Sequence, residues 1–330
     1  MYESFYGLRK NPFSLLPDPN FLYMGKKHSS AYSMLEYGLV NQAGFTVITG
    51  EIGCGKTTLI RHHLDQMGQD MTVGLVSNTL MTSDELLQWV LLAFDLDYRG
   101  KSKVECFDLF SDFLIDEYAK NRRTVLIVDE AQNLDARTLE ELRMLSNINS
   151  DSNQVLQLVL VGQPELKHTL HRPDMHQFAQ RVAVDYHLEA LGREETREYI
   201  HHRLSVAGGN RELFKSEACY LIYRSTQGIP RLINILCDTA LVYGYAENKK
   251  VIDAKLLMAV LKDQSARIKD DKLLKVTRDP AREKVVAMKD ALSSKTAVVP
   301  KRVAVSAKTV IPEKKEAPMM QGFSCLDVPW

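Results

Sequence analysis

Gly50, Gly55, Lys56 and Thr57 have the types and the spacing of the phosphate-binding loop Gly-x-x-x-x-Gly-Lys-[Ser/Thr]. The glycines allow backbone N–H groups to turn toward phosphate oxygens, and the N-terminus of a following helix adds a partial positive charge. In this pattern Lys56 reaches the β- and γ-phosphates of a nucleotide and the Thr57 hydroxyl holds Mg²⁺. The residues expected to bind the phosphates are Gly50, Glu51, Ile52, Gly53, Cys54, Gly55, Lys56, Thr57 and Thr58.

The segments on either side of this loop have the patterns that a phosphate site needs. Residues 45–49 are apolar and β-branched, as in a buried strand, and residues 57–67 have the pattern of a helix. The alternative is a glycine-rich turn with an accidental lysine. The order strand, glycine loop, helix favours the phosphate site.

Two carboxylates, Asp129 and Glu130, directly follow a second apolar strand predicted over residues 124–128. The carboxyl ends of parallel strands form the crevice in which open α/β sheets bind ligands. There Asp129 would act on Mg²⁺, and Glu130 would activate the attacking water as a general base. Taken alone, the pair could equally be a strand ending at the solvent, but the phosphate loop favours a shared site.

Three further polar residues are candidates for the same site. Gln163 follows the strand expected over residues 155–161, where it could orient the water or sense the γ-phosphate, or instead cap the helix that begins at Pro164. Arg231 lies at the start of a helix, where the dipole disfavours a cation unless a phosphate is near. Arg181 precedes the last short strand and could serve as an arginine finger, for its own site or for that of a neighbouring subunit.

The order of elements indicates two ordered domains. Single apolar strands alternate with helices up to about residue 190, which predicts a parallel sheet covered on both faces. Four helical stretches follow, at 193–207, 216–225, 231–247 and 253–264. We therefore expect a P-loop NTPase three-layer α/β sandwich over residues 29–190 and a small all-helical lid domain over 191–268.

The two ends of the chain differ in composition from these domains. Residues 1–28 are rich in aromatic residues and proline, which predicts an irregular segment packed on the ATPase core. Residues 269–330 are predicted to be mostly disordered, and the segment from Arg267 onward holds fourteen basic against eight acidic residues. This positive charge is too diffuse to predict a DNA-binding element.

Bulk composition excludes several classes of protein. The formal net charge is zero, so no overall field recruits nucleic acid or an acidic membrane. The five cysteines are scattered, which predicts neither a disulfide framework nor a zinc site. Cys54 could be a reactive thiol at a helix N-terminus, although a tolerated small residue is the simpler interpretation. With neither a signal peptide nor an apolar stretch of about 20 residues, a cytoplasmic protein is expected.

The motifs together resemble those of the AAA+ ATPases, and most closely the secretion ATPases of the ExeA/GspA type with their short MshM-like members. The resemblance covers residues 1 to about 265. It rests on the phosphate loop, the carboxylate pair and several short motifs. These are Phe5-Tyr6-Gly7-Leu8, Asn11-Pro12-Phe13, Pro17-Asp18-Pro19, Phe21-Leu22-Tyr23, Tyr37-Gly38-Leu39, Gly44-Phe45, Asp129-Glu130-Ala131-Gln132-Asn133-Leu134, Gly162-Gln163-Pro164-Glu165-Leu166 and Gly228-Ile229-Pro230-Arg231.

The resemblance implies Mg²⁺-dependent hydrolysis of ATP to ADP and phosphate, coupled to assembly of a pilus or secretion apparatus. It implies partners in that apparatus at the inner membrane, reached without a transmembrane segment of this chain, and a homo-oligomer. The larger secretion members carry a transmembrane helix and a peptidoglycan-binding module, and this sequence shows neither. Related transposition ATPases bind DNA, so a DNA-dependent ATPase acting in target selection is the alternative.

Overall fold

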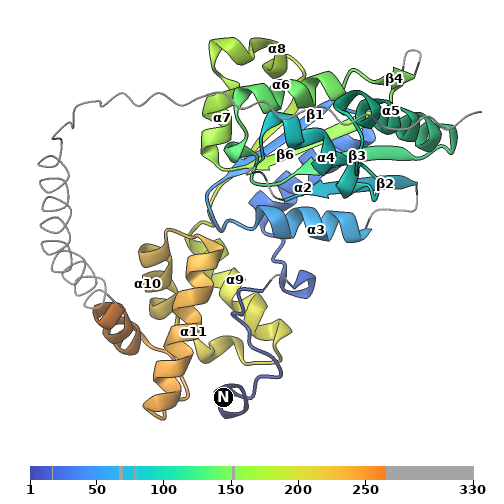
Figure 1. Ribbon diagram of the computed structural model, residues 1–330. Helices are drawn as coiled ribbons and strands as arrows, with labels where there is room; N and C mark the ends of the chain where they lie inside the picture. Colours follow the sequence, from blue (N-terminus) through green and yellow to red (C-terminus); the bar gives the residue numbers. More distant parts are fainter. Residues whose placement is uncertain (17, 67–69, 78, 80, 151–152, 265–330) are drawn as a thin grey trace, which may run out of the picture. The chain divides into compact units, whose positions relative to one another are not determined.

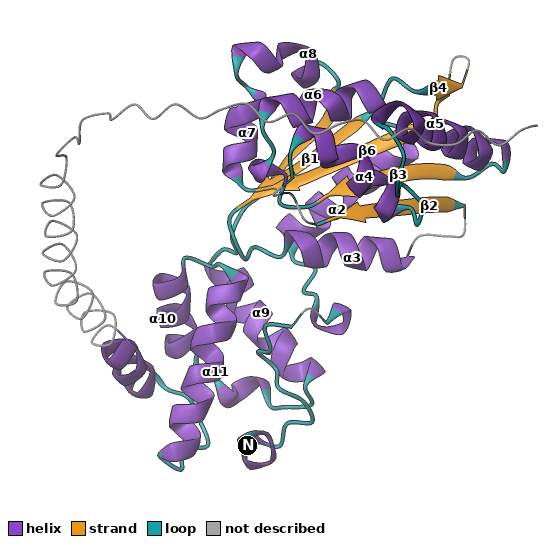
Figure 2. Ribbon diagram, viewed as in Figure 1, coloured by secondary structure: helices purple, strands orange, loops and turns teal. Residues whose placement is uncertain are grey.

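A parallel five-stranded sheet with the order β2-β3-β6-β1-β7 forms the centre of the N-terminal part (Figures 1 and 2). Its strands are β1 (Phe45–Gly50), β2 (Met71–Val76), β3 (Arg123–Val128), β6 (Leu156–Gly162) and β7 (Val182–Leu188). The computed structural model describes residues 1–264 except 17, 67–69, 78, 80 and 151–152. The predicted disorder of residues 269–330 lies outside the described residues.

Helices cover both faces of this sheet. They are α2 (Lys26–Val40), α3 (Lys56–Gln66), α4 (Ser83–Ala93), α5 (Lys103–Ala119), α6 (Ala136–Leu145), α7 (Pro164–Leu170) and α8 (His176–Ala179). Alternate residues of one strand point to opposite faces, so Leu126 packs in the cluster of α4 to α8 while Ile127 packs with α2 and α3. The predicted three-layer α/β sandwich is confirmed.

The strand order places three chain segments side by side at the carboxyl edge of the sheet. Strand β6 lies between β1 and β3, with Thr49 opposite Gly162 and Val128 opposite Leu160. The segments that follow these strands carry the phosphate loop, the carboxylate pair and Gln163. Residues far apart in the sequence therefore meet at one edge.

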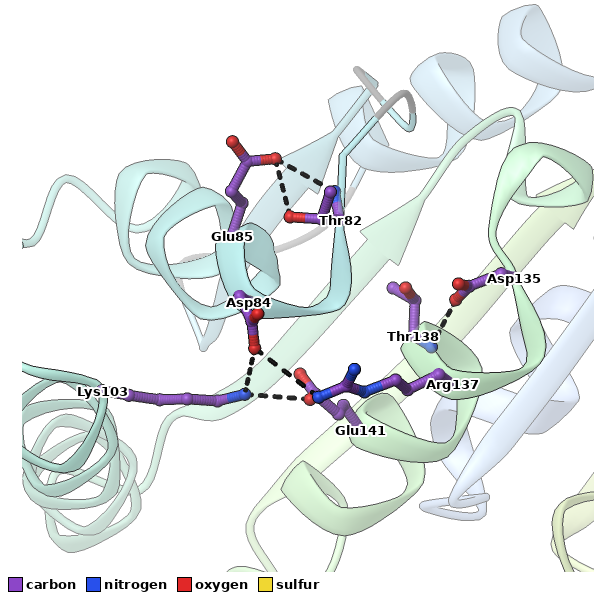
Figure 3. A network of polar contacts seen from close by, with 8 residues as sticks. All are labelled: Thr82, Asp84, Glu85, Lys103, Asp135, Arg137, Thr138 and Glu141. Carbon is purple, nitrogen blue, oxygen red and sulfur yellow. Dashed lines mark hydrogen bonds and ion pairs between the residues drawn. The ribbon is translucent and has the colours of Figure 1, made fainter. Parts of the chain in front are cut away.

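Each of the helices α4, α5 and α6 begins with a capping residue, and a group of charged side chains links their first turns (Figure 3). Lys103 Nζ lies 3.4 Å from Asp84 Oδ1 and 2.9 Å from Glu141 Oε1. Exposed ion pairs of this kind contribute about 1 kcal/mol or less each. These contacts connect the N-terminal parts of three helices on one face of the sheet.

Small differences separate the expected from the observed elements. The strands expected over 45–49, 124–128 and 155–161 are observed at Phe45–Gly50, Arg123–Val128 and Leu156–Gly162. A short antiparallel pair, β4 (Asn149–Ser150) with β5 (Asn153–Gln154), was not predicted. Two-residue strands carry too little side-chain periodicity to be read from a sequence.

A second hydrophobic core includes the buried apolar residues from Leu191 onward, close to the boundary expected near residue 190. It is built by α9 (Arg193–Val206), α10 (Ser216–Thr226), α11 (Pro230–Ala246) and a helix over residues 254–264. The four predicted helical stretches match these helices within two residues at each described end. A parallel bridge joins Phe214 to Ile252.

The N-terminal segment packs on these later helices rather than on the sheet. It contains α1 (Glu3–Tyr6) and a short 3-10 helix (Pro19–Phe21), and its buried side chains Tyr2, Leu8, Phe13 and Phe21 belong to the helical cluster. A few short helices cannot bury enough apolar surface alone, and aromatic rings supply much of it. The segment therefore docks on the helical part, and its 3-10 helix also contacts α3 of the sandwich, where docking on the core was expected.

Candidate nucleotide-binding site

A pocket of about 310 Å³ lies over the phosphate loop. One side is formed by Gly53 to Thr58 with Glu130 and Gln163 from the carboxyl edge of the sheet. The other sides come from the N-terminal segment and from helices α9 and α11. The pocket therefore collects most of the residues that the sequence nominated for phosphate and metal binding.

The backbone carbonyl oxygens of the phosphate loop are occupied by contacts within the protein. The Gly53 oxygen accepts from Arg231 N at 3.2 Å, and the Gly55 oxygen accepts from Leu59 N at 2.9 Å. Lys56 Nζ donates to the oxygens of Gly50 at 2.6 Å and Glu51 at 3.0 Å. The carbonyl oxygens of the loop therefore point toward donors of the protein. An anion site requires this, because a carbonyl oxygen that faced the anion would repel it.

Gly53 and Gly55 adopt backbone angles φ of 84° and 97°, in the left-handed region that glycine alone enters without strain. A Cβ atom at Gly53 would lie 2.6 Å from Arg231 Cβ. Conformation and space thus both require glycine at position 53. Through this contact the loop packs directly against the first turn of α11.

The Lys56 side chain is only 8% exposed. Burial lowers the pKa of its ammonium, while the Cys54 thiol and the carboxylates of Glu130 and Asp129 raise it. The structure thus holds the Lys56 ammonium in the phosphate loop, on the Gly50 and Glu51 oxygens.

Cys54 is not a reactive thiol in this structure. Its side chain is completely buried in a cluster with Ala31, Leu59 and Leu188. Burial raises the pKa of the thiol, which opposes the effect expected from a helix N-terminus. The simpler interpretation, a small residue that fits the space, is the one that this environment supports.

The fold brings Thr57 of the phosphate loop next to Asp129 of the carboxylate pair. Thr57 Oγ1 donates a hydrogen bond of 2.7 Å to Asp129 Oδ2, and Asp129 is 6% exposed. A hydroxyl and a carboxylate oxygen side by side fit Mg²⁺, which takes few protein ligands and completes its shell with water and phosphate. No group of three or more His, Cys, Asp or Glu side chains arranged for a metal occurs among the described residues.

Glu130 is held by two amide side chains. Its Oε2 accepts from Gln132 Nε2 at 2.6 Å and from Gln163 Nε2 at 3.3 Å. Gln132 Oε1 also accepts from Gln163 N at 3.0 Å. The backbone of Glu130 is left-handed, with φ of 54°, a conformation that is uncommon for a residue with a side chain. Residues 130, 132 and 163 thus form one polar cluster beside the pocket.

The two candidate arginines lie in different places. Arg231 lines the pocket. Arg181 is not among the pocket residues, and its Nη1 donates to Ser146 Oγ at 3.1 Å and to Asn147 Oδ1. The structure therefore brings Arg231, and not Arg181, to the phosphate loop of its own chain.

Sequence reasoning missed several residues of this site. His28 contacts the phosphate loop through the Cys54 oxygen, and Gln132 contacts Glu130. Tyr199, Arg203 and Asn234 line the pocket from the helical part. Gln132 could have been found from its position two residues after Glu130. The others carry no local signal, because only the tertiary fold brings them to the loop.

None of the helices among the described residues is both long and apolar enough to cross a lipid bilayer.

Residues 40–170 match the family model of an AAA domain. This match covers the phosphate loop, the carboxylate pair and Gln163, and it supports the predicted AAA+ resemblance for that part of the chain.

The chain is also similar to the general secretion pathway protein A of Aeromonas hydrophila, with 39% identity over 261 residues. The aligned part is 78% of this chain but only 48% of that protein, so the chain spans about half the length of this relative. The predicted resemblance to the ExeA/GspA type is thus supported, whereas closeness to the MshM-like members stays a prediction.

Two solved structures share the fold. The ORC2 protein of Aeropyrum pernix has a TM-score of 0.57 at 17% identity, covering 75% of this chain and 70% of that one. A Walker-type ATPase of Pyrococcus abyssi has a TM-score of 0.54 at 16% identity, covering 88% and 89%. At such identities the likeness concerns the fold alone, and it agrees with the predicted P-loop NTPase class.

Proposed function

We propose that this chain binds ATP with Mg²⁺ and hydrolyses it to ADP and phosphate. The observation that carries the proposal is the hydrogen bond of 2.7 Å between Thr57 of the phosphate loop and Asp129 of the sheet edge. It unites the two halves of a nucleotide site that are 72 residues apart in the sequence. A glycine-rich turn that binds no ligand would not need the Asp129 carboxylate beside it.

In this proposal each residue has a defined task. The N–H groups of the loop over Gly50–Thr58 and the Lys56 ammonium bind the β- and γ-phosphates. Glu130 accepts a proton from the attacking water, and the amide of Gln163 keeps its carboxylate in one orientation. Arg231, which lines the same pocket, stabilises the charge on the phosphoryl group during transfer.

The Thr57 hydroxyl and the Asp129 carboxylate would hold Mg²⁺. When bound, the ion neutralises charge that develops on the phosphate oxygens. The Glu130 N–H donates to Asp129 Oδ1 at 2.9 Å, so the carboxylate is held from both sides. The orientation of Asp129 is therefore set by the protein before any ligand binds.

The proposal is tested by measuring ATP hydrolysis with Mg²⁺ and after its removal by EDTA. Activity that requires both Mg²⁺ and Lys56 is expected. Lys56→Ala should weaken ATP binding itself, by about tenfold or more, because the buried cation at the phosphates is lost. Binding of ATP by Lys56→Ala with unchanged affinity would contradict the assignment.

We further propose that ATP turnover drives assembly of a secretion apparatus or pilus, at the inner membrane and through partner proteins. The similarity to a protein of the general secretion pathway supports this coupling. Cells producing the Glu130→Gln variant beside the wild type should assemble less of the apparatus, because inactive subunits enter it. Normal assembly at a high ratio of variant to wild type would contradict the coupling.

The effect of DNA on the rate of ATP hydrolysis distinguishes the proposed function from that of a DNA-dependent ATPase. In the proposed function, double-stranded DNA at low salt leaves the hydrolysis rate unchanged. Stimulation that falls steeply with rising salt would instead favour the DNA-dependent alternative.

We also propose that the chain forms a homo-oligomer in which Arg181 acts on the nucleotide of a neighbouring subunit. Its position away from the pocket of its own chain supports a role between subunits. Mixing Arg181→Ala with Lys56→Ala tests this, because a subunit intact at Lys56 can receive Arg181 from the other variant. Recovery of activity in the mixture is expected, and two inactive variants that stay inactive together would contradict it.

A further inference from the structure

His28 joins the start of helix α2 to the middle of the phosphate loop. Its imidazole is 4% exposed, and its Nε2 lies 3.0 Å from the backbone oxygen of Cys54. A carbonyl oxygen can only accept a hydrogen bond, so Nε2 must carry the proton and donate it. The contact links residues 26 positions apart in the sequence.

The peptide that this bond holds ends at a glycine, and a second glycine lies one residue before it. Cys54 is flanked by Gly53 and Gly55, which both have positive φ. Glycine restricts its neighbouring peptide planes less than any other residue. The orientation of the Cys54–Gly55 peptide therefore depends on contacts from outside the loop.

This orientation decides where a phosphate donor points. In a planar trans peptide the C=O and N–H groups point in opposite directions. When His28 holds the Cys54 oxygen on one side, the Gly55 N–H must point to the other. The Gly55 N–H belongs to the set of loop donors that cradles phosphate in this motif.

The neighbouring carbonyl oxygens are fixed by backbone donors. Gly53 O is held by Arg231 N and Gly55 O by Leu59 N. Backbone donors persist whatever side chain stands at their position. At the Cys54 oxygen, by contrast, the donor is a side chain, so one substitution can remove it.

We propose that His28 is a positioning residue of the phosphate loop, which fixes the Cys54–Gly55 peptide so that the Gly55 N–H faces the nucleotide phosphates. This inference rests on the proposed nucleotide binding.

The surroundings of the ring agree with this role. Nδ1 is buried and has no hydrogen-bond partner among the described residues, so the bond to Cys54 is the polar contact that the buried ring gains. Burial lowers the pKa of His28, with the Glu195 carboxylate opposing and the Lys27 ammonium adding to this effect. A leucine would fill this space and avoid the unpaired Nδ1, but it would leave the Cys54 oxygen without its donor, so the donor function is the reason for histidine.

The experiment compares His28→Gln with His28→Leu. The glutamine amide can place an N–H donor near the position of Nε2, whereas leucine has a similar size and no donor. The dissociation constant for ADP is measured by calorimetry, together with the melting temperature of the free protein. His28→Leu should bind ADP about tenfold more weakly, and His28→Gln should remain within about threefold of the wild type.

In steady-state hydrolysis, His28→Leu should raise the KM for ATP and leave kcat within about twofold, because the loop binds substrate without taking part in proton transfer. Wild-type affinity in His28→Leu would overturn the inference. An equal loss in His28→Gln and His28→Leu would also overturn it, since the donor would then be irrelevant.

A measurement on the wild-type protein makes the inference independent of variant folding. The ¹⁵N NMR pattern of the His28 imidazole reports its tautomer at neutral pH. A proton on Nε2 is expected, and a proton on Nδ1 would overturn the inference because Nε2 could not donate. Failure of the wild type to bind any nucleotide would refute the proposed function instead, which the calorimetry shows directly.

Discussion

Thr57 Oγ1 lies 2.7 Å from Asp129 Oδ2, so the first helical turn after the phosphate loop is bonded to the residue that directly follows strand β3. Strand β1, which leads into the phosphate loop, does not pair with strand β3, which leads to Asp129, because β6 lies between them. The contact therefore crosses over the carboxyl end of β6, where Gln163 also lies. Thr57, Asp129 and Gln163 thus lie close together at the carboxyl edge of the sheet.

Glu130→Gln is expected to bind ATP with nearly wild-type affinity and to hydrolyse it at least about 100-fold more slowly. A glutamine keeps the shape of the side chain but cannot accept a proton from water. Calorimetry gives the affinity, and release of phosphate gives the rate.

The matched control for this variant is Glu217→Gln on α10, an exposed carboxylate outside the pocket. It should leave the affinity for ATP and the rate of hydrolysis unchanged. A Glu130→Gln enzyme that turns over ATP at close to the wild-type rate would remove Glu130 from the mechanism.

Gly53→Ala should weaken nucleotide binding and destabilise the protein by about 2 kcal/mol or more, because it combines a strained backbone with a clash. The new Cβ would lie 2.6 Å from Arg231 Cβ in the first turn of α11. Urea denaturation and calorimetry measure the two effects.

Gly100→Ala separates strain from clash. Gly100 has φ of 72°, but nothing lies within 4 Å of an added Cβ. This control should lose about 1 kcal/mol from backbone strain and keep its nucleotide affinity. Equal nucleotide affinities in the two variants would show that the packing of the loop against Arg231 does not matter for binding.

The free energy of unfolding should decrease as the pH falls below about 6.5. Burial lowers the pKa of His28 and of His63 in the folded protein. The unfolded chain then binds protons that the folded chain does not. The contribution of these histidines to the free energy of unfolding is therefore fully present above their pKa in the unfolded chain, and it is lost as the pH falls toward their pKa in the folded protein.

For each such histidine the loss is about 1.4 kcal/mol per pH unit within that window. His28→Gln should therefore show a smaller decrease between pH 7.5 and 5.5, measured by urea denaturation at each pH. An unchanged slope in this variant would mean that His28 does not contribute to the acid sensitivity.

Arg203→Lys should loosen the N-terminal segment. The Arg203 guanidinium donates to the backbone oxygens of Pro12 and Ser14 and lies 4.8 Å from the centre of the Phe21 ring. Lysine keeps the charge but cannot make these contacts together. We expect a loss of about 2 kcal/mol in unfolding free energy and faster proteolysis within residues 1–28.

The control for this variant is Arg211→Lys, because Arg211 is exposed and bonds only the Ser205 hydroxyl among the described side chains. Its unfolding free energy should change by less than about 0.5 kcal/mol. If Arg203→Lys behaves like Arg211→Lys, the contacts of the Arg203 guanidinium do not hold the N-terminal segment in place.

The sequence by itself determined the sandwich and the later helices, because apolar residues repeat with the period of each element. It also located the loop at Gly50–Thr57 and the carboxylates at Asp129 and Glu130. These signals are local: a few adjacent residues carry both the structure and the chemistry. The positions of Gln163 and Arg231 also followed from the ends of predicted elements.

Only the tertiary structure decided which residues share the pocket. The strand order places Gln163 beside Glu130, and packing of α11 on the loop places Arg231 there, while Arg181 lies elsewhere. The burial of Cys54 and the contact of His28 with the loop had no local signal either. Such contacts join side chains tens of residues apart, and their geometry is fixed by the packing of whole elements.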